Sequence, residues 1–211
     1  MEFLPEEISQ YTESHTTPEP DLLSRLNRET WSKMLVPRML SGHLQGRTLS
    51  MLSHMIKPDR ILEIGTFTGY SALCLSEGLT ETGKVITIDI NEEFEDIIKK
   101  YINEANAKDK IEIIIGNALS VVPELNEEFD LVFIDADKEN YSNYFDLVID
   151  KVKKGGFIIT DNVLWSGKVL EDKADSETQA IKDFNRKMLD DKRVENVLFP
   201  IRDGLMICRK K

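Results

Sequence analysis

Two short stretches of the chain end in side chains that could bind a metal ion. The apolar run 131–134 is followed by Asp135, and the apolar run 157–160 is followed by Asp161 and Asn162. Such runs are typical of buried strands in a parallel sheet, where ligands bind just outside the carboxyl ends. Asp161 and Asn162 alone would suit a helix cap. With Asp135 on an adjacent strand, however, two carboxylates and an amide oxygen predict a site for Mg²⁺, Mn²⁺ or Ca²⁺ rather than zinc.

A glycine-containing turn predicts a second half of the site. In the stretch 61–75, a predicted strand passes through Glu63 and is followed by Gly65 and Gly69 before a helix begins. Glycines there allow a ligand close to the backbone and to the helix N-terminus, but the G-x-G-x-x-G spacing of dinucleotide sites is missing. Asp89 ends the next predicted strand, where a carboxylate can accept hydrogen bonds from ribose hydroxyls. Glu63 and Asp89 together suit a ligand with a ribose, a positive charge and no phosphates, such as S-adenosylmethionine.

Strand-like and helical segments alternate along the chain after residue 58. The expected strands cover 60–64, 84–88, 111–115, 131–134 and 157–160, and the expected helices cover 70–79, 91–104 and 141–152, with an acidic turn around Pro123. This order predicts an α/β fold with a doubly wound parallel sheet and right-handed crossovers. A helix over 176–189 and two runs over 194–199 and 205–209 follow, and the two runs are interpreted as a closing antiparallel hairpin.

The first 57 residues are expected to form an N-terminal arm and helices that pack on this core. Residues up to about 20 would be a loosely held arm or a short helix, followed by a helix over 21–35 that Pro37 ends. A second helix carries an apolar stripe, interpreted as dimer or core packing, and Pro58 stops it; the stripe is Leu44, Met51, Leu52, Met55 and Ile56. Because we find no internal repeat or linker, we interpret residues 1–211 as a single domain.

The composition is that of an ordinary soluble domain. The 211 residues include 27 Lys and Arg and 38 Asp and Glu, for a net charge of −11, which disfavours polyanionic partners at long range. No apolar run approaches the roughly 20 residues that span a bilayer, and the N-terminus lacks the pattern of a signal peptide. Cys74 and Cys208 show no metal or redox spacing, so we expect reduced thiols in a cytoplasmic protein.

In combination, four motifs resemble the cation-dependent O-methyltransferases, the family of caffeoyl-CoA and catechol O-methyltransferases. The motifs are LEIGTFTGYS, IDADKENY, DNVLWSGKV and PIRDGL. The resemblance runs from about Leu22 to the C-terminus and points to a bacterial-type member. It implies a Rossmann-like, seven-stranded, mostly parallel sheet with helices on both faces and a reversed last strand. It also implies S-adenosylmethionine as cofactor and, usually, a homodimer.

The resemblance further implies roles for single residues. Asp135, Asp161 and Asn162 match the metal ligands, with the carboxylates 26 positions apart (161 − 135). The matches to the S-adenosylmethionine contacts are Ser41, Glu63, Gly65, Thr66, Ser71, Asp89 and Ala118. Lys138 matches the lysine that acts as general base in the catechol enzyme, while Asp137 and Ser166 fall where plant enzymes contact cofactor or substrate. The N-terminal arm and the loop before Asp135 depart from the plant enzymes, so the caffeoyl-CoA specificity does not carry over.

These residues would carry out methyl transfer to an aromatic hydroxyl. A divalent cation that binds two adjacent hydroxyls favours the anion and fixes the ring, with Lys138 and Asp135 as catalytic residues. Lys138 could instead be a solvated lysine at a helix start, and Trp165 could be a core aromatic or a wall that orients a flat substrate. We expect an enzyme that methylates a catechol-like small molecule with S-adenosylmethionine and a divalent metal.

Two other functions stay open at this point. One is a tRNA-modifying enzyme of the same family that methylates a hydroxylated uridine. A basic patch of Arg38, Arg47, Lys168 and Lys173 around the site would favour it, and the net charge disfavours it. The other is a non-catalytic nucleotide-binding module of the same fold, which the presence of the metal ligands and the base disfavours.

Overall fold

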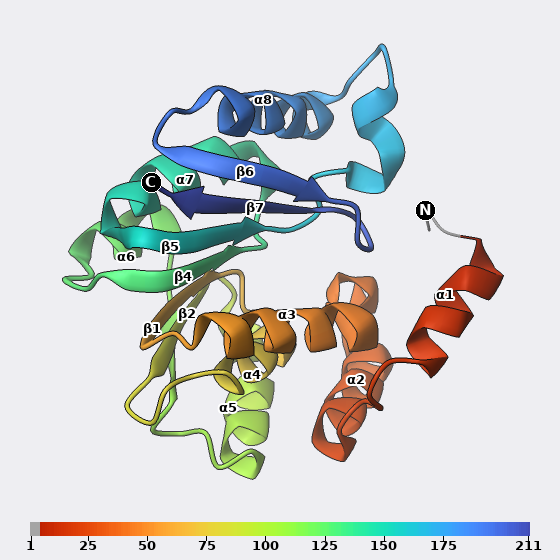
Figure 1. Ribbon diagram of the computed structural model, residues 1–211. Helices are drawn as coiled ribbons and strands as arrows, with labels where there is room; N and C mark the ends of the chain where they lie inside the picture. The colour runs from red at the N-terminus through yellow and green to blue at the C-terminus, as the bar shows by residue number, and fades with distance from the viewer. Residues whose placement is uncertain (1–4) are drawn as a thin grey trace.

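A single sheet forms the centre of the molecule (Figure 1), as the computed structural model of residues 5–211 shows. Its strand order is β3-β2-β1-β4-β5-β7-β6. The strands are β1 (Arg60–Ile64), β2 (Lys84–Asp89), β3 (Ile111–Ile115), β4 (Phe129–Ile134), β5 (Val152–Thr160), β6 (Val194–Phe199) and β7 (Leu205–Lys210). Strands β1 to β5 pair in parallel, and β7 is antiparallel to both β5 and β6. The predicted mostly parallel, seven-stranded sheet with a reversed last strand is confirmed.

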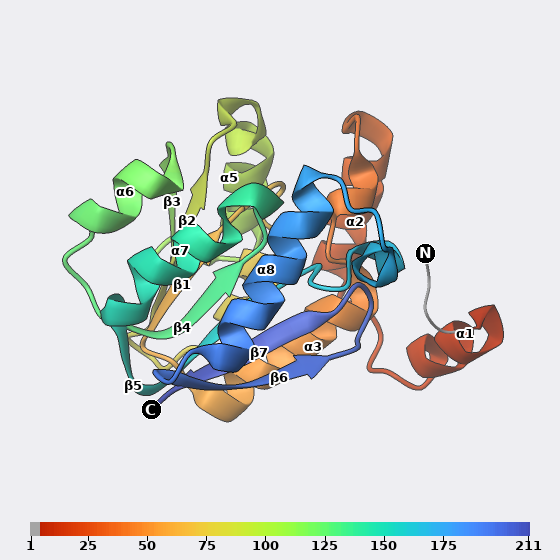
Figure 2. The ribbon, with the colours of Figure 1, turned by 90° about the horizontal axis from the view of Figure 1, so that it is seen from above.

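Helices cover both faces of this sheet. The α-helices are α1 (Glu6–Ser14), α2 (Asp21–Lys33), α3 (Gly42–Ile56), α4 (Tyr70–Ser76), α5 (Glu95–Glu104), α6 (Ala118–Glu124), α7 (Tyr141–Val148) and α8 (Ser176–Asp190). Short 3₁₀ helices are η1 (Pro37–Met39), η2 (Glu92–Phe94), η3 (Lys138–Asn140), η4 (Ile149–Lys151) and η5 (Trp165–Leu170). Seen from above, α6, α7 and α8 lie together over one face (Figure 2). None of the helices between residues 5 and 211 has the length and apolar character that a membrane crossing requires.

Alternate residues of each central strand feed two separate apolar cores. On β1, Leu62 and Ile64 pack with α6, α7 and α8, whereas Ile61 packs with α2, α3, α4 and α5. On β4, Val132 and Phe133 divide between the two cores in the same way. Because both faces are buried, the strands are continuously apolar, and this is why their sequence runs could be recognised.

Several predicted boundaries differ from the structure. Pro123, assigned to a turn, lies in the last turn of α6, and the helix ends one residue later; a proline supplies no N–H to continue the ladder. Strand β5 begins at Val152, and α7 ends at Val148, earlier than predicted. Lysines and two glycines occupy the first half of β5, and Gly155 has a φ of +83°, so that half shows no apolar run.

The N-terminal segment forms three α-helices in the described residues. α1 has no buried residue, whereas α2 buries Leu23 and Leu26 against the sheet core. In α3, Met51 and Met55 are 63% and 74% exposed, so the core-packing interpretation of the stripe is wrong for these two residues. The first four residues of the predicted arm lie outside the described part of the chain, and the single-domain interpretation stays a prediction.

The half-buried carboxylate of Glu29 connects α2 to α5. Glu29 accepts hydrogen bonds from Lys100 Nζ at 2.5 Å, from Lys33 Nζ at 2.7 Å and from Tyr101 Oη at 2.7 Å. The bond from Lys100, followed by those from Lys33 and Tyr101, lowers the pKa of Glu29 to about 2. This charge therefore holds an N-terminal helix to the sheet layer.

We predict that Glu29→Gln lowers the free energy of unfolding by about 1–2 kcal/mol at pH 7, because hydrogen bonds to charged groups are worth about 1.5–3 kcal/mol and exposure weakens them. A carboxylate with a lowered pKa stabilises the fold above its unfolded pKa, near 4.5, and loses this effect as the pH falls toward 2. Urea unfolding at several pH values should show the difference from wild type shrinking below about pH 4.5. Glu81→Gln, at an exposed site, is the control, and a difference independent of pH would contradict the prediction.

Candidate functional site

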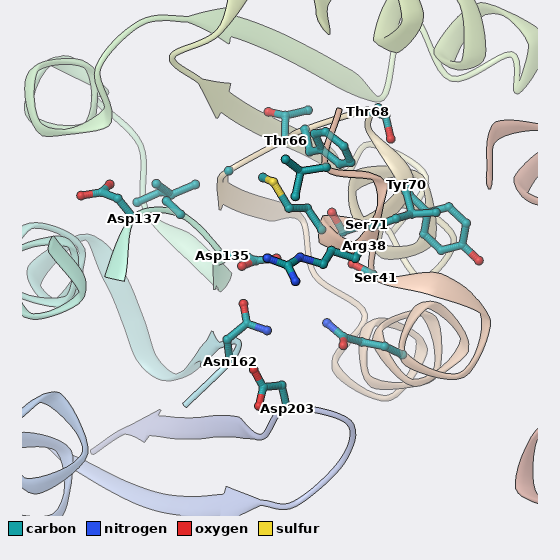
Figure 3. A pocket seen from close by; sticks show the side chains of 18 of the residues that line it. Arg38, Ser41, Thr66, Thr68, Tyr70, Ser71, Asp135, Asp137, Asn162 and Asp203 are labelled. Carbon is teal, nitrogen blue, oxygen red and sulfur yellow. The ribbon is translucent and has the colours of Figure 1, made fainter. Parts of the chain in front are cut away.

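The carboxyl ends of the parallel strands open onto a cavity of about 1530 Å³. Segments 36–45 and 162–168 form other parts of its wall, and Figure 3 shows the side chains that converge there. Most of the predicted site residues line it: Ser41, Gly65, Thr66, Ser71, Asp89, Ala118, Asp135, Asp137, Lys138, Asn162, Trp165 and Ser166. Glu63 and Asp161 do not, and both are almost completely buried.

The turn after β1 passes directly against the end of β4. Gly65 has a φ of +99°, and a Cβ atom at this position would lie 2.0 Å from the carbonyl oxygen of Asp135. Only glycine fits both the backbone conformation and this contact. The close approach brings the glycine turn and Asp135 together in one wall of the cavity.

Asp89 holds the glycine turn through its backbone. Its Oδ2 atom accepts hydrogen bonds from the N–H groups of Thr66 at 3.0 Å and Phe67 at 2.7 Å, and its Oδ1 atom accepts one from Asn91 N–H at 2.9 Å. Phe67 adopts a left-handed φ of 49° in this turn. Sequence reasoning assigned Asp89 to a ligand and missed this structural role. A carboxylate has about four acceptor sites, so the two roles are compatible.

Glu63 lies beneath the same turn with no exposed surface. Its Oε2 atom accepts a hydrogen bond from Thr87 Oγ1 at 2.5 Å, and Thr66 Oγ1 lies 2.5 Å from the same hydroxyl. Burial, and secondarily the nearby carboxylates of Asp135 and Asp89, raises the pKa of Glu63 to about 8. Glu63 therefore supports the floor of the cavity rather than its surface.

Lys138 joins two of the predicted metal ligands. Its Nζ atom donates hydrogen bonds to Asp135 Oδ1 at 3.0 Å, to Asn162 Oδ1 at 2.8 Å and to Tyr141 Oη at 2.6 Å. The side chain is buried, which excludes the interpretation of a solvated lysine. Burial raises the pKa of Tyr141 well above its usual value, so its hydroxyl stays protonated and donates to the carbonyl oxygen of Asp161 at 2.9 Å.

Asp161 lies behind the cavity wall. Its Oδ2 atom accepts a hydrogen bond from Gln45 Nε2 at 2.5 Å, and its Oδ1 atom accepts one from the N–H of Asn162 at 2.7 Å. Burial, with the Asp135 carboxylate as the next cause, raises the pKa of Asp161 to about 7. Arg202 donates to Gln45 Oε1 at 3.1 Å. Neither Gln45 nor Arg202 was assigned a role in the site from the sequence, although Arg202 lies within the PIRDGL motif.

The chemistry of these groups fits a hard divalent cation. The Lys138 ammonium group lies 3.0 Å from Asp135 Oδ1 and 2.8 Å from Asn162 Oδ1, so these two oxygens already bind a cation. Within residues 5–211 no three His, Cys, Asp or Glu side chains gather, so the donor set would be two carboxylates and the Asn162 amide. Oxygen donors of this kind are those that Mg²⁺ and Ca²⁺ prefer, with water completing the shell.

Asp137 faces a different set of partners. Its Oδ1 atom accepts a hydrogen bond from Tyr144 Oη at 2.5 Å, and Asn140 Nδ2 donates to its Oδ2 atom. The carboxylate also lines the cavity. It is therefore fixed at the rim by η3 and α7.

Trp165 forms part of the cavity wall beside Lys138. Its ring centroid lies 5.6 Å from Lys138 Nζ and 5.8 Å from Lys168 Nζ. Trp165 and Ser166 have left-handed φ angles of 48° and 53°, and the N–H of Ser166 donates to Asp203 Oδ1 at 2.6 Å. Trp165 belongs to neither buried apolar core, which favours the wall interpretation over the core one.

The four basic residues considered for an RNA-binding patch do not gather at this cavity. Arg38 and Lys168 line it, whereas Arg47 and Lys173 do not. Arg47 instead forms an ion pair with Glu77 at 2.7 Å. Two of the four basic side chains could therefore contact a ligand in the cavity.

Comparisons with known proteins agree with this geometry. A family model described as O-methyltransferase matches residues 12–211. Caffeoyl-CoA O-methyltransferase 1 of Eucalyptus globulus is 35% identical over 204 residues, which cover 91% of this chain and 82% of the relative.

Solved structures are similar over nearly the whole chain. The O-methyltransferase from Bacillus cereus in complex with SAH has a TM-score of 0.90 at 31% identity and covers 97% of both chains. The SAH-bound methyltransferase PaMTH1 of Podospora anserina also has a TM-score of 0.90, at 29% identity, and covers 99% of this chain and 98% of its own. The predicted resemblance is confirmed: the chain belongs to the O-methyltransferase family.

Proposed function

We propose that this protein methylates one hydroxyl of a vicinal dihydroxy aromatic small molecule, the methyl acceptor. A divalent cation, preferably Mg²⁺, would bind beside this acceptor. As a member of its family the protein is an S-adenosylmethionine-dependent O-methyltransferase. The proposal goes further, to the metal, the acceptor and the residues. It rests above all on the convergence of Asp135, Asn162 and Lys138 beside the Trp165 ring.

The cofactor would occupy the part of the cavity near β1, β2 and β3. Its proposed contacts are Ser41, Gly65, Thr66, Ser71, Asp89, Ala118 and Asp137, with Glu63 acting from beneath the glycine turn. Support comes from Gly65 and Thr66, which line the cavity, and from the acceptor sites left on Asp89. The carboxyl groups of Asp89 and Asp135, which also line the cavity, favour a sulfonium there.

Asp135, Asp161 and Asn162 would hold the cation. When bound, a divalent cation supplies a Lewis acid that lowers the pKa of the acceptor hydroxyl and fixes its two oxygens. Asp161 would have to share its carboxylate between the cation and Gln45. The acceptor ring would lie against Trp165 and Ser166, and good alignment of the two reactants can contribute about 7–11 kcal/mol.

Lys138 is the proposed general base. Its three acceptors fix Nζ at the boundary between the metal ligands and the acceptor wall. As a neutral amine it would keep two of these bonds and direct its lone pair at the acceptor hydroxyl. The Tyr141 hydroxyl, which stays protonated, holds Nζ in place without competing for the proton.

The small-molecule acceptor is favoured over tRNA, because only Arg38 and Lys168 of the four basic candidates line the cavity. The homodimer and the cytoplasmic location stay predictions.

We predict that Asp89→Ala weakens S-adenosylmethionine binding by about 10- to 150-fold, equivalent to the loss of a charge-assisted hydrogen bond of about 1.5–3 kcal/mol. Since Asp89 also holds the glycine turn, Asp89→Asn serves as the matched variant: its amide oxygen can still accept from the backbone. Calorimetry of cofactor and of Mn²⁺ checks both, and metal affinity should barely change. Unchanged cofactor affinity in Asp89→Ala would place the cofactor elsewhere.

We predict that Lys138→Met lowers kcat by roughly 10²-fold, the low end for general-base catalysis because the cation already acidifies the hydroxyl. The affinity for S-adenosylmethionine should stay within error of wild type. Lys187→Met, on α8, controls for loss of a lysine outside the cavity. Near-normal kcat on catechol at neutral pH would assign the base to another group or to solvent.

We predict that excess EDTA abolishes turnover of catechol and that Mg²⁺ or Mn²⁺ restores it, because three protein oxygens leave positions for two acceptor oxygens and water. Asp161→Asn should behave like the chelated enzyme. Circular dichroism should show an intact fold in both cases, since the core is the apolar sheet. Full activity at zero measured metal content would remove the cation from the mechanism.

A further inference from the structure

We propose that the β6–β7 turn is a positioning element for the acceptor and metal half of the site. Arg202 acts through Gln45 on the carboxylate of Asp161, and Asp203 fixes the loop that carries Asn162 and Trp165. The metal part of this inference rests on the proposed function.

Arg202 connects the turn to the segment before α3. Its Nη2 atom donates hydrogen bonds to the carbonyl oxygens of Leu40 at 2.7 Å and Arg38 at 3.2 Å, while its Nη1 atom donates to Gln45 Oε1 at 3.1 Å. One guanidinium thus contacts two carbonyls of the cavity wall and one side chain of α3. A planar group with five N–H donors can make these bonds together, whereas a lysine cannot reproduce the fork.

The bond from Arg202 decides the orientation of the Gln45 amide. Arginine has only donors, so it must meet the oxygen Oε1, and this turns the amide nitrogen toward Asp161. Gln45 is 1% exposed, and its Nε2 atom lies 2.5 Å from Asp161 Oδ2. Without the guanidinium, Oε1 would lose its hydrogen-bond donor, and only the Asp161 carboxylate would still hold the amide. Arg202 therefore sets the direction of a hydrogen bond to a proposed metal ligand.

Asp203 fixes the opposite wall. Its Oδ1 atom accepts from the N–H of Ser166 at 2.6 Å, and its carbonyl oxygen accepts from the N–H of Leu164 at 2.9 Å. The next residue, Gly204, has a φ of +87°, and a Cβ atom there would lie 2.6 Å from Leu164 Cγ.

The loop that Asp203 holds is strained. Asn162, Trp165 and Ser166 all have φ between 48° and 57°, in the left-handed region, which is unfavourable for Trp and Ser and less so for Asn. Such a conformation persists only where its surroundings fix it. Figure 3 shows Asp203 and Asn162 among the side chains that line the cavity.

The two residues of the turn differ in which part of the site they border. The hydrogen bonds of Asp203 go to Leu164 and Ser166, away from the proposed cofactor contacts. Arg202 bonds the carbonyl oxygen of Leu40, which precedes Ser41, a proposed cofactor contact, and it bonds Gln45 on the metal side. A positioning role therefore predicts that Gln45→Met changes metal affinity, and Asp203→Ala the exchange of its loop, without changing cofactor affinity.

The test uses the full chain and the variants Arg202→Met, Gln45→Met, Asp203→Ala and Asp203→Asn. Mn²⁺ affinity is measured by electron paramagnetic resonance, SAH affinity by calorimetry, and backbone protection by hydrogen exchange with mass spectrometry. Arg202→Met and Gln45→Met should weaken Mn²⁺ binding by about 10–100-fold, the effect of losing a partner of a metal ligand. Arg202→Met should also speed exchange in peptides covering 36–41.

The Asp203 pair tests the other arm without any metal. Asp203→Ala should speed amide exchange over 162–168, and Asp203→Asn should restore protection, because the amide oxygen can still accept from Ser166. SAH affinity should stay within about twofold for the Gln45 and Asp203 variants. Arg186→Met, at an exposed site on α8, is the control for charge loss.

Three outcomes would overturn the proposal: unchanged exchange in both Arg202→Met and Asp203→Ala, no rescue by Asp203→Asn, or SAH affinity that falls in parallel with Mn²⁺ affinity in Gln45→Met. If the wild type binds no Mn²⁺, the proposed metal fails, and the exchange data alone decide whether the turn positions the two walls.

Discussion

The site depends on one constraint, the common register of the parallel strands at their carboxyl ends. Ile64 of β1 pairs with Ile134 of β4, and Ile134 pairs with Thr160 of β5. The backbone hydrogen bonds of the sheet continue one residue past the strands. The N–H of Asp135 donates to the carbonyl oxygen of Ile64, and the N–H of Asp161 donates to that of Ile134, each at 2.9 Å. Asp135 and Asp161, the first residues after β4 and β5, are thereby fixed side by side. Their backbone N–H groups are used in the sheet, and their side chains are left for the site.

The electrostatics of this edge follow from its burial. Glu63 and Asp161 are buried carboxyl groups whose pKa values burial raises, to about 8 and about 7, and Asp135 lies near both. Lys138 is the cation that bonds directly to Asp135. A buried charge without sufficient partners is costly, and the cost falls when another cation enters. This excess of acidic groups over cations would favour both a sulfonium and a metal ion beside the same strand ends.

The sequence predicted the part of the structure that local pattern controls. The bounds of β1, β3 and β6 agree with the predicted runs. β1 is buried inside the sheet, which favours a continuous apolar run, whereas β3 and β6 are the partly buried edge strands. The start of β5 was missed, since Gly155 and its lysine neighbours carry no apolar signal. The candidate site was predicted wherever a residue directly follows a strand, as Asp135 and Asp161 do.

What the sequence could not predict are contacts between distant segments. Gln45 lies on α3, 116 positions from Asp161 and 157 from Arg202, and no spacing rule connects them. The hairpin turn was recognised, but its Arg202 and Asp203 could equally have been solvent-exposed turn residues. Because α3 also carries Arg47, Thr48, Ser50 and Ser53, one more polar residue on this helix gave no signal of a buried partner.

The two halves of the cavity therefore have different physical origins. The proposed cofactor half is made by strand ends and by a glycine turn that the sheet register fixes, so it would change little unless the sheet changes. The proposed acceptor half is made by the loops 36–40 and 162–168, which the β6–β7 turn holds together through side-chain hydrogen bonds. Because side-chain bonds can be replaced without disturbing the sheet, acceptor choice can vary independently of cofactor binding. For the same reason, the identity of the acceptor has to be sought in these loops, with Trp165, Arg38 and Lys168 as the side chains that a new acceptor would meet first.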